Sequence, residues 1–125
     1  MSRFASDDGS AVVEFVLVSI LLVTVLLGVL QLTLALHVRN TVVDAAGEGA
    51  RYGALAQSSP AAGAARTSEL VATALSPRYG ENVTAEVVER DGLVLVEVTV
   101  RAPLPVLGLL GPGGTLTASG RAVQE

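Results

Sequence analysis

The feature that most constrains this chain is an uncharged, apolar run near its amino terminus. Residues 15–36 are 22 consecutive positions without a charged side chain. At about 1.5 Å per residue, a helix of this length covers roughly 33 Å, about the thickness of a bilayer's hydrocarbon core. Because lipid offers no partners for backbone hydrogen bonds, the run must satisfy its own N–H and C=O groups. We therefore predict one transmembrane helix.

This run does not fit a cleaved secretory signal. The apolar stretch of such a signal is usually about 7–15 residues long and follows a basic segment. Here the run is longer, and residues 1–9 contain one Arg and two Asp. No good A-x-A site follows residue 36. Arg3 precedes the span and Arg39 and Arg51 follow it, so the positive-inside rule does not decide the orientation.

Composition excludes several classes of protein. The 125 residues leave room for one small domain beside the span. The net charge of −4 and the absence of Lys argue against nucleic-acid binding, which usually needs a basic face. Cys is absent, so disulfides and thiolate metal sites are excluded.

Small residues recur at helical spacing in two places. Beyond the span, Ala45, Gly49 and Gly53 are four residues apart and fall on one face of a continuing helix. Within the span, Thr24, Gly28 and Gln31 share a face with Ala35. Small residues let another helix approach closely, so both stripes are candidates for helix packing. The alternative is that small residues are simply common in membrane helices.

The rest of the chain changes from helical to strand periodicity. Residues 57–63 have the composition of a linker, and residues 64–75 are predicted to form a second helix that ends before Pro77. Three strands are predicted, over residues 82–90, 93–101 and 115–123. Asp91 and Gly92 are a strong signal for a two-residue hairpin turn.

Alternation assigns one face of each strand to the core. The residues expected on these faces are Val83, Ala85 and Val87, then Val94, Val96, Val98 and Val100, then Leu116, Ala118 and Ala122. The connection over residues 103–114 is too apolar for a free loop. The predicted fold class is membrane-anchored α+β: a long N-terminal transmembrane helix, a short second helix and a three-stranded antiparallel sheet.

No catalytic constellation is evident. The single His, His37, is expected to be an interfacial residue, and Asp44 and Glu48 are expected on an exposed helix face. The glycines near residue 111 are not followed by the Lys and helix of a phosphate-binding loop. We therefore predict neither an enzyme nor a bound cofactor or metal.

The start of the span carries a short pattern of its own. Gly9 and Ser10 are followed by Glu14 and Phe15, and then by the apolar run. This resembles the class III signal of type IV pilin-like proteins, which a membrane prepilin peptidase cuts after the Gly on the cytoplasmic side. The resemblance implies a cut between Gly9 and Ser10 and a role for Glu14 in pairing with a neighbouring subunit's new amino terminus. Asp7 and Asp8 depart from the basic residues common in such leaders.

The order of motifs along most of the chain resembles the TadE-like family, the minor pseudopilins of tight-adherence (Flp) pilus systems. The motifs are the leader, the acid at mature position five, the span, the small-residue helix, the hairpin, the apolar loop and the final strand. Size favours this family over the longer TadG-like proteins.

The resemblance implies a leader over residues 1–9, a transmembrane helix with its extension over 10–56, and a pilin-like extracytoplasmic domain over 57–125. It implies the prepilin peptidase, other pilin-like subunits and the membrane platform of the pilus as partners, besides the lipid bilayer. It also implies a bacterial cell membrane with the amino terminus in the cytoplasm.

Two alternatives remain at this point. The chain is an uncleaved single-pass protein whose outer domain binds another envelope protein or the cell wall, or it is a small subunit of an envelope enzyme or transporter. The first predicts an intact tail over residues 1–9. The second predicts stable co-purification with a catalytic partner.

Overall fold

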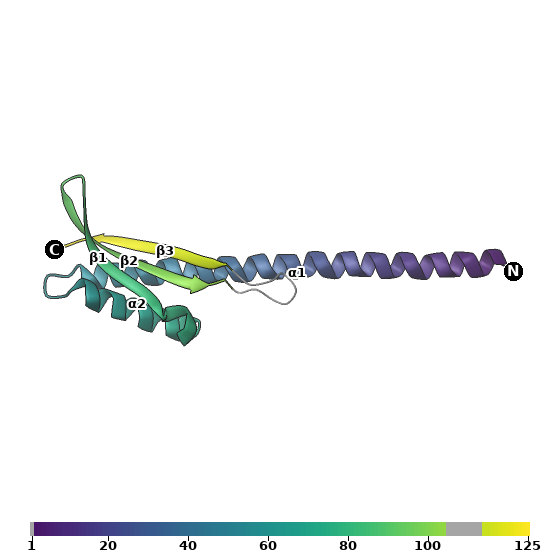
Figure 1. Cartoon of the computed structure of the whole chain (residues 1–125), viewed down its shortest axis with the longest axis horizontal. Helices are drawn as coiled ribbons and strands as arrows, with labels where there is room; N and C mark the ends of the chain where they lie inside the picture. The colour runs from purple at the N-terminus through teal and green to yellow at the C-terminus, as the bar shows by residue number, and fades with distance from the viewer. Residues whose placement is uncertain (1, 105–113) are drawn as a thin grey trace. The chain divides into compact units, whose positions relative to one another are not determined.

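A computed structural model describes residues 2–104 and 114–125 (Figure 1). The elements are the helices α1 (Ser2–Gly53) and α2 (Pro60–Ala74), the short 3-10 helix η1 (Pro77–Gly80), and the strands β1 (Asn82–Arg90), β2 (Leu93–Pro103) and β3 (Thr115–Val123). They form two compact units, Met1–Thr33 and Leu34–Glu125. The predicted fold class is confirmed: a long apolar N-terminal helix, a short second helix and a three-stranded antiparallel sheet.

The first unit consists of the N-terminal part of α1. Its large apolar side chains are exposed around the helix, as Phe15, Leu22 and Leu32 illustrate at 74%, 65% and 61%. Between Asp8 and Gly53, α1 is long and apolar enough to cross a membrane. Exposed apolar surface all round a helix is typical of a lipid-facing segment.

The second unit contains the sheet, in the order β1-β2-β3. β2 is the central strand and pairs antiparallel with both neighbours, with Val98 opposite Ala85 on one side and Gly120 on the other. The β1–β2 connection is the predicted two-residue turn. Asp91 and Gly92 both have positive φ, 53° and 78°, as a type I′ turn requires.

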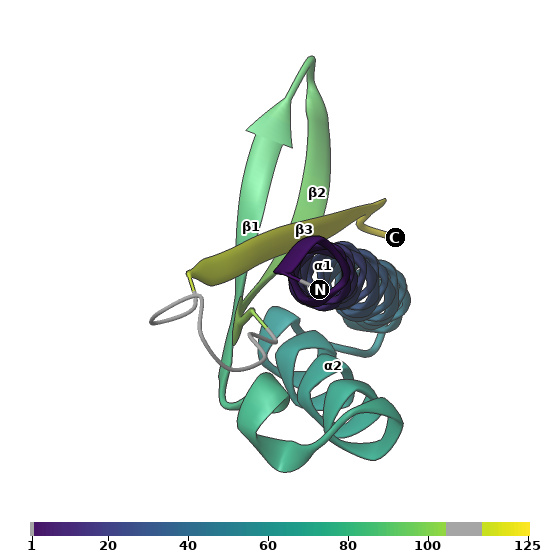
Figure 2. The same cartoon turned by 90° about the vertical axis from the view of Figure 1, so that its right-hand side faces the viewer.

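The core of this unit lies between one face of the sheet and two helices. α2 and the C-terminal part of α1 lie side by side on that face (Figure 2). β2 contributes every second residue from Val96 to Ala102, all fully buried. The helices contribute Val38, Val42 and Val71. Three strands with one apolar face need such a cover to be stable.

The second helix begins earlier than predicted. It starts at Pro60, whereas the sequence interpretation placed its start at residue 64 and assigned residues 57–63 to a linker. Ser59 has extended backbone (φ −146°, ψ 159°), and its hydroxyl accepts a hydrogen bond from the Ala62 N–H at 3.1 Å. Ser59 is therefore the N-cap and Pro60 occupies the first helical position, where proline lacks only a hydrogen bond that would not form.

The predicted sheet face is left uncovered at two positions near the hairpin tip. Val87 and Val94 are 50% and 41% exposed. Figure 2 shows that the β1–β2 hairpin projects past the helices, so its end has no cover. β2 also extends two residues beyond its predicted end, to Pro103. The loop predicted over residues 103–114 lies largely outside the described residues.

Candidate assembly and membrane-anchoring site

The predicted processing junction lies on α1. Gly9, Ser10, Glu14 and Phe15 are all exposed, and a Cβ placed on Gly9 would meet nothing within 4 Å. Helical backbone is continuous through the junction, since α1 begins at Ser2. Another protein can therefore reach this segment from any side.

Glu14 is the only acid within the described residues of α1 between Gly9 and the end of the apolar run, and it forms no ion pair among the described residues. A carboxylate at the centre of a membrane helix costs about 2.5–3.5 kcal/mol, and less near the interface. A cation from another molecule would lower that cost. The position thus favours pairing with a partner over isolation in lipid.

The stripe inside the span has no glycine-mediated contact with the residues that the structure describes. Thr24 and Gly28 are exposed, and a Cβ on Gly28 would meet nothing within 4 Å. The Thr24 hydroxyl donates to the Ile20 carbonyl oxygen at 2.7 Å, so the helix itself satisfies this group. Gln31 is half-buried. The part of the stripe at Thr24 and Gly28 is therefore accessible to lipid or to a helix of another protein.

The stripe beyond the span packs against α2 of the same chain. A Cβ on Gly49 would lie 2.7 Å from the Gly63 carbonyl oxygen, and one on Gly53 would lie 3.1 Å from the Gly63 Cα. Ala45 is 6% exposed, and its carbonyl oxygen lies 3.4 Å from the buried Thr67 hydroxyl. These distances leave no room for a side chain, so the two backbones are in direct contact.

The third glycine contact joins α1 to the sheet. A Cβ on Gly120 of β3 would lie 2.6 Å from the backbone carbon of Ala46 and from the Cα of Gly47. Sequence reasoning missed Gly63, Thr67 and Gly120. Of these, Gly120 carried a signal, because glycine inside a strand often marks the close approach of another backbone.

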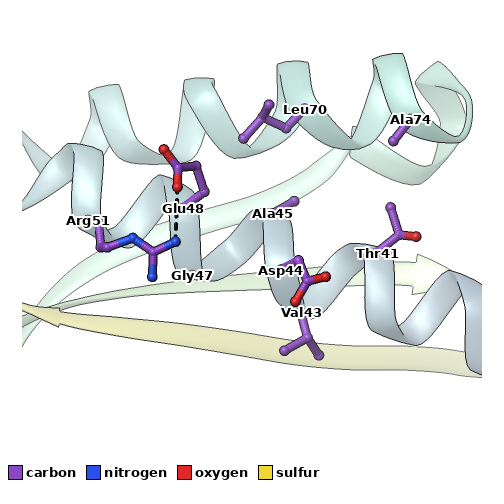
Figure 3. Close-up of a pocket in the computed structure, with 9 residues that line it drawn as sticks. All are labelled: Thr41, Val43, Asp44, Ala45, Gly47, Glu48, Arg51, Leu70 and Ala74. Carbon is purple, nitrogen blue, oxygen red and sulfur yellow. Dashed lines mark hydrogen bonds and ion pairs between the residues drawn. The ribbon is translucent and has the colours of Figure 1, made fainter.

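The groove between α1 and α2 is the most defined hollow near this stripe. It has a volume of about 550 Å³ (Figure 3) and is lined by Thr41, Val43, Asp44, Ala45, Gly47, Glu48, Arg51, Leu70 and Ala74. Glu48 accepts a hydrogen bond from Arg51 at 2.9 Å across one turn of α1. The groove is open, and the side chains of Arg51 and Glu48 are both more than half exposed.

Among the described residues that line the groove, Asp44 and Glu48 are the only carboxylates that could bind a metal ion, and no His lines it. No group of three or more His, Asp or Glu side chains that could hold a metal was found in the described part of the chain. His37 is exposed on α1, where its carbonyl oxygen accepts a hydrogen bond from the Thr41 hydroxyl at 2.9 Å. The described residues thus present surfaces for packing, for lipid and for other proteins.

A family comparison identifies the segment that carries these features. Residues 9–51 match the family model described as TadE-like protein. The matched segment is therefore similar to TadE-like proteins. It begins at the predicted junction, contains Glu14 and the whole apolar run, and ends at Arg51, within the packing stripe. No curated protein and no solved structure matches the chain.

α2 and the sheet lie outside the matched segment. The similarity to TadE-like proteins therefore resides in α1, and it is the link between this chain and pilin-like proteins of tight-adherence pilus systems.

Proposed function

We propose that this chain is a minor pilin-like subunit used in the assembly of a tight-adherence (Flp) pilus. In this proposal a prepilin peptidase removes residues 1–9 at the cytoplasmic face of a bacterial membrane. α1 then anchors the mature subunit, and the domain built from α2 and the sheet faces outward. Other pilin-like subunits and the pilus membrane platform are its partners.

The observation that carries the proposal is the extent of the family match. It starts at Gly9, the residue after which the peptidase is expected to cut, and runs through Glu14 and the span. A match confined to the apolar run would indicate only a membrane helix. The inclusion of the junction supports a processed subunit.

Glu14 has a defined role in the proposal. Removal of residues 1–9 creates a new amino group on Ser10, only four residues before Glu14. Both groups then lie at the membrane edge, where the low dielectric strengthens the attraction between opposite charges. Pairing of Glu14 with the amino group of a neighbouring subunit would set the axial register of the two helices.

The first test is the intact mass of the full chain, extracted from membranes with and without its cognate prepilin peptidase. We expect a peptidase-dependent loss equal to residues 1–9. Gly9→Leu should abolish this loss, whereas Gly28→Leu, a matched change in the open part of the same helix, should leave it intact. An unchanged mass, with the peptidase active on a known substrate, would refute the processing step.

The role of Glu14 is tested by substitution. Glu14→Ala should preserve membrane insertion and leader removal but reduce surface piliation about tenfold, because the register-setting ion pair is lost. Glu48→Ala is the matched control: it removes an exposed acid from the same helix, where its partner is Arg51. Pili should be counted by electron microscopy. Normal piliation with Glu14→Ala would contradict the assigned role.

A second candidate is an uncleaved single-pass protein whose outer domain binds another envelope protein or the cell wall. One observation favours it: the backbone is helical on both sides of the Gly9–Ser10 bond. A peptidase that binds extended substrate would have to unwind this turn before cutting. An intact tail in the mass measurement would select this candidate.

A further inference from the structure

Two arginines of the second unit converge on one hollow of the domain. The hollow has a volume of about 330 Å³ and is lined by Arg78 and Arg101, together with Glu81, Asn82, Ala102, Pro103, Gly114 and Thr115. Arg101 lies directly opposite Asn82 in the β1–β2 register. Neither arginine forms an ion pair with any residue that the structure describes. The site thus combines two guanidinium groups, without ion pairs among the described residues, with the Glu81 carboxylate and the neutral polar side chains of Asn82 and Thr115.

The level of this hollow along α1 follows from the packing of β3. Gly120 lies against Ala46 and Gly47, and the Glu125 N–H donates to the Ala54 carbonyl oxygen at 2.8 Å. β3 therefore runs in the same direction as α1. Five residues, from Gly120 to Glu125, advance along α1 from Ala46 to Ala54, roughly 12 Å at about 1.5 Å per helix residue. Thr115, five residues before Gly120, therefore lies roughly 12 Å nearer the start of α1.

A distance of roughly 12 Å corresponds to about eight residues of helix. Thr115 and the hollow therefore lie at about the level of Arg39, just beyond Leu36, where the charge-free run ends. This is the level at which a membrane-spanning α1 leaves the hydrocarbon and enters the headgroup layer. Arg39, exposed on α1, lies at the same level.

The neighbouring aromatic residue fits this location. The Arg78 guanidinium carbon lies 5.3 Å from the centre of the Tyr79 ring, and Tyr79 packs partly against the core. Tyrosine is enriched where a membrane meets water, because its ring is apolar and its hydroxyl is polar. The stacked ring also limits the freedom of Arg78, so less entropy is lost when its guanidinium binds an anion.

From this geometry we infer that the Arg78–Arg101 hollow binds the phosphodiester of an anionic glycerophospholipid headgroup. The guanidinium groups bind the phosphate oxygens, for which their planar forks are suited. The carboxylate of Glu81 accepts hydrogen bonds from headgroup hydroxyls, which makes a glycerol headgroup a better ligand than a choline headgroup. With two arginines against one carboxylate, the hollow keeps a net positive charge in a chain whose net charge is −4.

This site would hold the outer domain against the membrane surface while α1 anchors it. The inference requires that α1 spans a membrane, but it requires neither leader removal nor pilus assembly. A variant that no longer binds the lipid but still loses residues 1–9 would therefore show that the lipid site and the processing step can be tested independently.

The test is native mass spectrometry of the full chain in detergent micelles, titrated with phosphatidylglycerol, phosphatidylcholine or inorganic phosphate. A basic side chain at an anionic surface contributes about a fivefold change in affinity, so Arg78→Gln with Arg101→Gln should weaken phosphatidylglycerol binding roughly 25-fold. Arg101→Lys keeps the charge but loses the planar fork, and a smaller loss is expected. Phosphatidylcholine should bind more weakly than phosphatidylglycerol to the unmodified chain.

The control is the pair Arg66→Gln with Arg90→Gln, which removes the same charge elsewhere. Arg66 is ion-paired with Glu69 at 3.6 Å, and Arg90 lies beside the hairpin turn. This control should change phosphatidylglycerol binding by less than about twofold, and circular dichroism should show that both double variants remain folded. Equal losses in the two double variants would overturn the site. Displacement of phosphatidylglycerol by inorganic phosphate at a similar concentration would overturn its assignment to lipid.

Discussion

The two parts of α1 share one backbone conformation but differ in the size of their side chains. Residues 15–33 are mostly large and apolar, and most of them are exposed. From Val38 to Gly53 the helix buries a stripe dominated by Ala, Gly and Val. The first part carries no charged side chain, whereas the second carries Arg39, Asp44, Glu48 and Arg51. Side-chain size also separates the two parts, because large side chains suit fluid lipid, whereas small ones allow a second backbone to approach.

The largest expected effect tests whether small size is required only beyond the span. Gly120→Ala should lower the free energy of unfolding by about 3 kcal/mol, because the new Cβ would meet backbone atoms of Ala46 and Gly47 that cannot rotate away. Gly28→Ala should be neutral within about 0.5 kcal/mol, since its surroundings are open. Urea unfolding of the full chain in detergent, followed by the sheet's circular dichroism, measures both. Similar losses would remove the distinction between the two parts.

A smaller effect is expected from two neighbouring valines beyond the span. Val42 is fully buried, whereas Val43 is 37% exposed. Val42→Ala should cost about 2 kcal/mol of unfolding free energy, from lost burial and the cavity left behind. Val43→Ala should cost less than about 0.5 kcal/mol. The same urea titration checks this pair, and equal costs would mean that this turn of α1 does not face the core.

The smallest effect compares two threonines that both bond to a helix carbonyl. The Thr67 hydroxyl is buried and donates to the Gly63 carbonyl oxygen at 2.9 Å, whereas the exposed Thr24 hydroxyl donates to Ile20. Thr67→Val should cost about 1 kcal/mol, because the hydroxyl is also close to the carbonyl oxygen of Ala45 on the other helix. Thr24→Val should leave domain unfolding unchanged. A neutral Thr67→Val would show that packing alone joins the helices.

The strands were predictable because their signals are local. Alternating valines, together with Asp91 and Gly92, specify a hairpin within a short stretch of chain. The start of α2 was missed because serine and proline are typical of linkers as well as of helix starts. Val94 alternates with Val96, but the sequence does not reveal that the helices end before the hairpin does.

The stripe of Ala45, Gly49 and Gly53 shows a different limit. Helical spacing predicts a face that another helix can approach closely, but it does not identify which helix packs there. Here it is α2 of the same chain, through Gly63. The hollow at Arg78 and Arg101 could not be predicted either, since these residues are distant in sequence and are brought together by η1 and β2. The junction and the role of Glu14 stay predictions, which rest on the spacing of Gly9 and Glu14 before the apolar run.

The packing of Gly120 against Ala46 and Gly47 also determines when the domain can complete its fold during synthesis. α1 is synthesised first and β3 last, yet each covers the other. Until β3 has been synthesised, β2 lacks one of its two hydrogen-bonded neighbours, and residues such as Val98 are only partly covered. The domain therefore completes its sheet only after residue 123, and a chain stalled before residue 115 would expose an unpaired strand edge to other chains.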